Sequence, residues 1–113
     1  MSNEPKNNDG DRPQNSFDRI DKLVHEPARL AILANLYVVD SADFIFLERQ
    51  TGLTPGNLSR HLSRLESSRY VEIRKDFVRN RPRTTLRLTE AGRRAFREYV
   101  ANMKGVLEGI VEP

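Results

Sequence analysis

The amino-acid sequence predicts a mainly helical α+β domain that contains one small antiparallel β-hairpin and ends in a long C-terminal helix. Three observations predict this fold class. Apolar residues recur every three or four positions over most of the chain, residues 70–74 and 84–88 alternate as strands do, and a further helical stripe follows them. The length of 113 residues supports one domain and hardly two.

The N-terminal segment divides into a polar tail and a first helix. Residues 1–16 contain no apolar side chain after Met1, so we expect a disordered tail there and the domain over residues 17–113. Ser16 is a suitable N-cap, and Pro27 should end the first helix because proline disfavours a helical conformation in the residue before it. The helical spacing is carried by Phe17, Ile20, Leu23 and Val24.

Two more helices are expected before the middle of the chain. One runs from Pro27 to about Val39 and is apolar nearly all round, which is typical of a central core helix. Residues 40–43 form a polar break. The apolar run 44–47 either starts a short strand or leads directly into a helix, and its periodicity does not decide between them. A helix from about Ile45 to Thr51 must stop at Gly52.

The clearest helix start is Thr54-Pro55, a capping hydroxyl followed by proline. Leu58, Leu62 and Leu65 then form one apolar stripe. At about 100° per residue, the outward side carries small, hydroxyl, amide and guanidinium groups, on Gly56, Asn57, Ser59, Arg60, Ser63 and Arg64. His61 lies at the margin of the stripe, where packing is the more common role and a phosphate contact is the alternative.

The two alternating segments should pair as a hairpin around a polar, basic loop, Arg79–Arg83. Thr89 is then placed to cap the last helix, with Glu90 in its first turn, and that helix should run to about Glu108.

Positive charge is concentrated in one third of the chain. The whole chain has a net charge of +3 and a sequence pI of about 9.6. Residues 54–87 contain nine basic and three acidic side chains, a net of +6, so the remainder carries −3. Such a distribution is expected of a surface that meets a polyanion.

Two helices joined at residues 51–54 and followed by a basic hairpin form a helix-turn-helix with a wing. The second helix would enter the major groove of double-stranded DNA, where arginine can bind guanine and asparagine adenine. The wing would contact a phosphate backbone or a minor groove. The alternatives are a solvated helix face and an ordinary solubilising loop. The predicted DNA-binding residues are Thr54, Gly56, Asn57, Ser59, Arg60, Ser63, Arg64, Arg79, Arg81 and Arg83.

The segments GLTPGNLSRHLSRLESSRYVEI and LRLTEAGRRAF, with the Arg/Pro loop between them, resemble the winged helix DNA-binding regulators of the MarR/ArsR-like group. EPARLAILANL is similar to the helix that precedes the motif in that group. The resemblance covers about residues 17–103 and implies homodimeric repressors or activators that bind specific DNA sequences in prokaryotic cytoplasm. One departure is Arg69, since the group often has glycine before the tyrosine that follows.

The last helix carries an apolar seam that suggests a partner. Packing on the domain's own core is the alternative, but the earlier helices already supply much of that core. We therefore expect a two-fold dimer interface built from both ends of the domain. Its predicted residues are Phe17, Ile20, Leu23, Phe96, Tyr99, Met103, Val106, Leu107 and Ile110.

Other classes of function lack support in the sequence. The absence of cysteine excludes disulfides, thiolate nucleophiles and Cys-based zinc fingers, and the two histidines have no metal-site spacing. We expect no enzyme activity, no cofactor and no metal, because neither a Gly-rich phosphate loop nor a catalytic triad is evident. No apolar run suggests a membrane span or signal peptide, so a cytoplasmic location is expected. A non-specific architectural DNA binder and a winged-helix protein-interaction module stay open, and no polar cluster marks an effector pocket.

Overall fold

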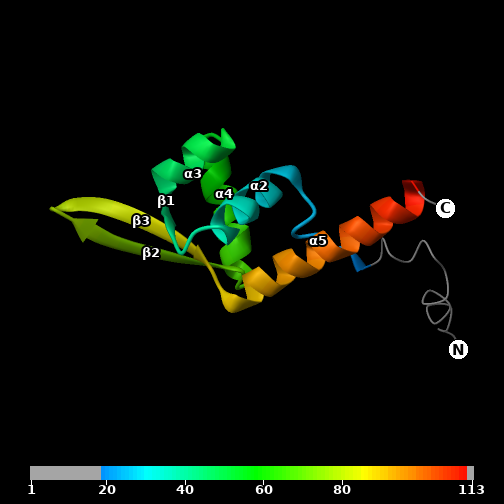
Figure 1. Cartoon of the computed structure of the whole chain (residues 1–113). Helices are drawn as coiled ribbons and strands as arrows, with labels where there is room; N and C mark the ends of the chain where they lie inside the picture. The colour runs from blue at the N-terminus through cyan, green and yellow to red at the C-terminus, as the bar shows by residue number, and fades with distance from the viewer. Residues whose placement is uncertain (1–18, 112–113) are drawn as a thin grey trace, which may run out of the picture.

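The computed structural model describes residues 19–111, so the expected tail, the Ser16 cap and Phe17 lie outside the described residues. Figure 1 shows a helical body from which a long hairpin projects on one side and the C-terminal helix on the other. The elements in chain order are α2 (Pro27–Tyr37), β1 (Ala42–Asp43), α3 (Phe44–Thr51), α4 (Pro55–Ser67), β2 (Val71–Val78), β3 (Arg81–Leu88) and α5 (Glu90–Val111). This is the α+β fold class that the sequence predicts.

The first predicted helix is wrong over the described residues, because residues 20–26 form bends and turns. The Oδ1 atom of Asp21 accepts hydrogen bonds from the backbone N–H groups of Leu23 (2.9 Å) and Val24 (3.4 Å). An aspartate that binds the backbone two and three residues ahead competes with helix formation. The hydroxyl of Tyr70 donates to Asp21 Oδ2 at 2.7 Å, which fixes this carboxylate in the turn.

Helix α2 is the central core helix, as predicted. The side chain of Glu26 caps its start by accepting from the backbone N–H of Arg29 at 2.7 Å. The helix ends at Tyr37, slightly before the predicted Val39. The buried core around it is made by Ile20, Val24, Ile32, Leu33, Leu36, Ala42, Leu47, Leu58, Leu62, Leu65, Val71, Leu86, Leu88, Tyr99 and Val106.

The ambiguous segment after α2 contains both a strand and a helix. Ala42 and Asp43 pair with Leu86 and Thr85 of β3, so the supposed polar break ends in strand β1. The side chain of Asp43 then caps α3 by accepting from the backbone N–H of Phe46 at 2.8 Å. Gly52 ends α3 in the left-handed conformation (φ 72°), as its position in the sequence predicts.

The three-stranded antiparallel sheet has the order β1-β3-β2, and its hairpin strands are longer than predicted. Pairing runs from Val71↔Leu88 to Val78↔Arg81, so the loop shrinks to a two-residue turn at Arg79 and Asn80. Both turn residues have positive φ (54° and 65°), which is the conformation that two-residue hairpin turns favour. Arg81 and Arg83 therefore lie on strand β3 and not in a loop.

Helix α5 begins as predicted, because Thr89 Oγ1 accepts from the backbone N–H of Gly92 at 2.9 Å. It continues to Val111, a little beyond the predicted end. Tyr99 and Val106 are buried on the inner side of the helix, and burial raises the pKa of Tyr99. The Tyr99 hydroxyl lies 2.8 Å from His25 Nδ1, which ties α5 to the N-terminal turn. Across residues 19–111, no helix has the length and apolar character needed to cross a bilayer.

Candidate nucleic-acid interface

Helix α4 separates an inner apolar side from an outer polar side, as its spacing predicts. Thr54 caps the helix by accepting from the backbone N–H of Asn57 at 3.2 Å, and Pro55 occupies the first turn. Leu58, Leu62 and Leu65 are buried against the core. The structure brings the predicted contact residues of this helix together on one exposed face, formed by Thr54, Gly56, Asn57, Ser59, Arg60, Ser63 and Arg64.

Two of these outward residues are already connected. Arg60 Nη2 donates to Asn57 Oδ1 at 2.7 Å across one turn of the helix. The bond leaves the other guanidinium N–H groups and the asparagine NH₂ group free to meet a ligand. The pair is thus a preformed group of donors on an exposed helix face.

His61 lies on the buried side of α4, beneath this exposed face. It is only 8% exposed, and Arg29 Nη1 lies 3.2 Å from its Nδ1 atom. Because arginine can only donate, His61 Nδ1 acts as the acceptor and the ring is neutral in this arrangement. Burial lowers the pKa of His61; Arg29, Arg60 and Arg64 lower it further, whereas Glu26 raises it. These contacts favour the packing role for His61.

The end of α4 sets the direction in which the hairpin leaves. Arg69 has φ 66°, the left-handed conformation in which the related group often places glycine. The backbone N–H of Tyr70 donates to Leu65 O and that of Arg69 to Glu66 O, both at 2.9 Å. This pair of bonds is a Schellman ending, which satisfies carbonyls that the helix leaves free.

The wing presents its arginines unequally. Arg79, Arg81 and Arg83 are all exposed, but Arg83 Nε lies 3.7 Å from Asp76 Oδ1. A second cross-strand ion pair joins Arg87 Nε to Glu72 Oε1 at 3.4 Å. Arg79 and Arg81 at the tip are thus better placed than Arg83 to meet a phosphate.

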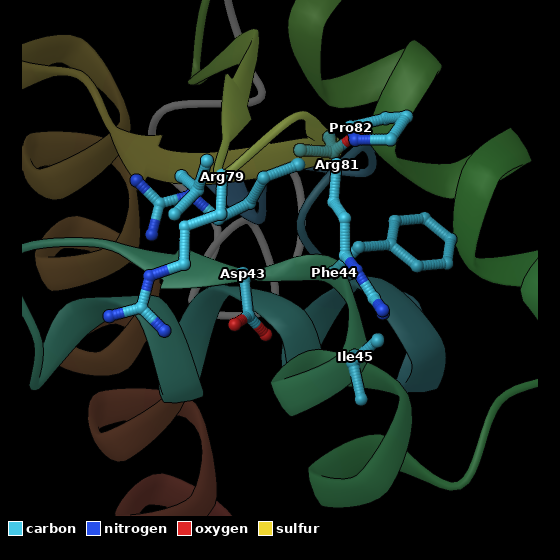
Figure 2. A pocket seen from close by; sticks show the side chains of 9 residues that line it. Asp43, Phe44, Ile45, Arg79, Arg81 and Pro82 are labelled. Carbon is cyan, nitrogen blue, oxygen red and sulfur yellow. The ribbon is translucent and has the colours of Figure 1, made fainter.

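A cleft of about 730 Å³ lies between the wing and the start of α3. Figure 2 shows Arg79 and Arg81 on the wing side of this cleft, opposite Asp43, Phe44 and Ile45. The cleft has guanidinium groups on one wall and mostly apolar groups on the other. Its lining comprises Asp43, Phe44, Ile45, Val78, Arg79, Arg81, Pro82, Arg83 and Thr84.

A second cleft, of about 460 Å³, joins α4 to the hairpin. Ser59 and Ser63 line it from α4, while Lys75 and Thr84 line it from the strands. Lys75 is not among the DNA-binding residues predicted from the sequence. The alternation Val71, Ile73, Lys75 was the available signal, since it places Lys75 on the side that faces α4.

Residues 28–107 match the family described as "Winged helix DNA-binding domain". The chain belongs to this family. The winged helix chain is also 37% identical over 79 residues to the uncharacterized protein MJ0432 of Methanocaldococcus jannaschii, covering 70% of this chain and 86% of the relative. The resemblance to winged helix regulators seen in the sequence is confirmed.

Solved structures agree with this assignment. A transcriptional regulator homologue from Pyrococcus horikoshii OT3 is similar with a TM-score of 0.78 and 28% identity, over 87% of this chain and 96% of that one. A MarR-family transcriptional regulator from Silicibacter pomeroyi shares the fold, with a TM-score of 0.61 and 22% identity over 91% and 68% of the two chains.

The predicted dimer residues of this winged helix domain differ in exposure. Ile20, Tyr99 and Val106 are buried in the chain's own core, whereas Leu107 and Ile110 are exposed. Leu23, Phe96 and Met103 are half-buried against the core. Residues 19–111 contain no group of three or more side chains suited to hold a metal ion.

Proposed function

We propose that this winged helix chain is a transcriptional regulator that binds specific sequences of double-stranded DNA as a homodimer. The observation that carries the proposal is the exposed polar face of α4 beside an arginine-bearing wing. An α-helix with its N-terminal half exposed fits the major groove of B-DNA. The homologue from Pyrococcus horikoshii, described as a transcriptional regulator homologue, supports the same role.

In the proposed complex, α4 lies in the major groove, and different residues contact the bases and the phosphates. Arg60 and Asn57 read base edges, because guanidinium and amide groups can each form paired hydrogen bonds with a base. Ser59, Ser63 and the α4 N-terminus bind phosphate oxygens. The wing arginines Arg79 and Arg81 hold the adjacent backbone or minor groove.

The proposed dimer uses the outer part of α5. Val100, Leu107, Ile110 and Val111 are exposed there, and Leu107 and Ile110 are 52% and 63% accessible. Two-fold symmetry would place two α4 helices about one DNA turn, or ~10 bp, apart on a pseudo-palindromic site. Leu107→Asp should convert the dimer to a monomer in sedimentation analysis, whereas a monomeric wild type would contradict this arrangement.

The first experiment is selection from a random duplex library at near-physiological salt, followed by titration of the selected and scrambled duplexes. Specific regulation predicts an enriched two-fold motif that is preferred ~1,000-fold or more. Arg60→Ala should then lose ~1–3 kcal/mol on the selected site alone. Tight, salt-sensitive binding without a motif would instead indicate an architectural DNA binder. Failure to bind any duplex would favour a protein-interaction module.

A further inference from the structure

The hairpin has an inner face that continues from the core to the tip of the wing. Side chains on a strand alternate between faces, so Phe77 lies on the same face as Val71, Ile73 and Lys75. The register places Pro82 directly opposite Phe77. Val71 is 2% exposed, whereas Phe77 is 72% exposed. The inner face is thus covered by helices near the core and uncovered at the Phe77–Pro82 pair.

Pro82 fits this position without loss of sheet pairing. Strand β1 pairs only with Leu86 and Thr85, so the edge of β3 beyond them is open at Pro82. A proline can occupy such an uncovered edge because its missing N–H removes no bond to another strand. Together with Phe77 it forms an exposed apolar pair on the inner face of the wing.

The charges around the pair indicate the chemistry of its partner. Lys75 precedes the pair on the same inner face, and Arg79 and Arg81 flank it at the tip. The acidic residues of β2, Glu72 and Asp76, lie on the outer face, where both contact arginines. The inner face therefore combines the apolar pair with Lys75, whereas Arg81, opposite Val78, lies on the outer face beside the turn. An apolar pair bordered by cations suits an anionic partner that also offers apolar surface.

The same face is continuous with the proposed DNA-contacting helix. The cleft between α4 and the hairpin is lined by Ser59 and Ser63 on one side and by Lys75 and Thr84 on the other. Thr84 and Pro82 are alternate residues of β3 and so lie on one face. A duplex seated on α4 would extend along this cleft toward the wing tip, and this continuity favours DNA over a separate protein partner.

We propose that Phe77 and Pro82 pack against the deoxyribose walls of the DNA minor groove while Arg79 and Arg81 bind the phosphates beside them. The inference rests on the proposed DNA binding and adds an apolar contact to it. Deoxyribose carbons line the minor groove, and apolar side chains such as phenylalanine and proline are used by proteins that bind there. The contact adds affinity without adding a charge.

Phe77→Ala should therefore weaken binding to the selected duplex about tenfold, equal to ~1.4 kcal/mol. Phe77→Leu should keep most of the wild-type affinity. The salt dependence should be unchanged because no phosphate contact is lost, whereas Arg81→Ala should reduce the salt slope by about one. The matched control is Val38→Ala, which removes an exposed apolar side chain (77% accessible) that lines neither cleft and should bind as the wild type does.

Hydroxyl-radical footprinting locates the contact, because the radicals attack deoxyribose exposed in the minor groove. Wild type and Val38→Ala should protect the sugars next to the α4 site, and Phe77→Ala should lose only that protection. A wild-type footprint that Phe77→Ala leaves unchanged would overturn the apolar contact and leave the proposed function intact. A wild type without any footprint would overturn both. An altered oligomeric state of free Phe77→Ala would assign the pair to a protein interface and also overturn the contact.

Discussion

Gly92 brings the start of α5 close to the backbone of Tyr70, and an alanine there is expected to destabilise the fold. A Cβ atom on Gly92 would lie 2.1 Å from the carbonyl oxygen of Tyr70 and 2.9 Å from its carbon. Even a tight contact of 3.4 Å would require the two segments to separate by about 1.3 Å. The backbone of α5 fixes the position of the Cβ, and the atoms it would meet belong to the backbone of Tyr70. No flexible side chain can therefore move aside.

The carbonyl that must move is part of a small network of hydrogen bonds. Tyr70 O accepts from the backbone N–H of Thr89 at 3.0 Å, and Thr89 Oγ1 donates to Arg69 O at 2.6 Å. Overpacking costs ~1–3 kcal/mol. A disrupted hydrogen bond adds ~1 kcal/mol. The better helix propensity of alanine returns at most ~1 kcal/mol. An approach of 2.1 Å places the overpacking cost in the upper part of its range. We therefore expect Gly92→Ala to lower the free energy of unfolding by ~2–3 kcal/mol.

Gly105→Ala is the matched control, because Gly105 lies in the same helix and a Cβ there would have no neighbour within 4 Å. It should raise the free energy of unfolding by up to ~1 kcal/mol. Thermal unfolding followed by circular dichroism at one protein concentration should show a melting temperature lowered by roughly 10–20 °C in Gly92→Ala and slightly raised in Gly105→Ala. Equal midpoints for Gly92→Ala and wild type would refute the steric reasoning.

Three further results are expected. Because Arg60 donates to Asn57, alanine variants of the two should show a coupling of ~0.5–3 kcal/mol in a double-mutant cycle of DNA binding, and additive losses would contradict a shared unit. Burial lowers the pKa of His61 from 6.5, so the stability contributed by its neutral form is complete above pH 6.5 and is lost as pH falls toward the lowered folded value. Urea unfolding between pH 7.5 and 5 should show this loss of stability in wild type and less of it in His61→Asn. An equal pH dependence of the free energy of unfolding in the two proteins would argue against a role for His61. Arg69→Gly should raise the free energy of unfolding by ~0.5–1 kcal/mol, because φ is 66° there, and a lower melting temperature would count against that account.

Local signals in the sequence were sufficient for several elements. Thr54-Pro55 marks the start of α4, and three leucines at helical spacing identify its buried side. Gly52 marks the end of α3, and Thr89 marks the start of α5. These signals operate within a few residues of one another, so they predict both a helix and the face it exposes. The outward set on α4 follows from that spacing alone.

Other features depend on residues that are distant in the chain. The turn at Asp21 is fixed in part by Tyr70, 49 residues away, and apolar periodicity alone predicts a helix there. The two-residue strand β1 exists because Ala42 and Asp43 pair with β3.

The wing shows the same division between sequence and tertiary structure. The sequence by itself determined that a basic hairpin follows α4, because the alternation and the arginines are local. Only strand pairing decided that Asp76 lies opposite Arg83 and Phe77 opposite Pro82. A shift of one residue in register would exchange the two faces of a strand, so the charged and apolar sides of the wing are decided by tertiary structure.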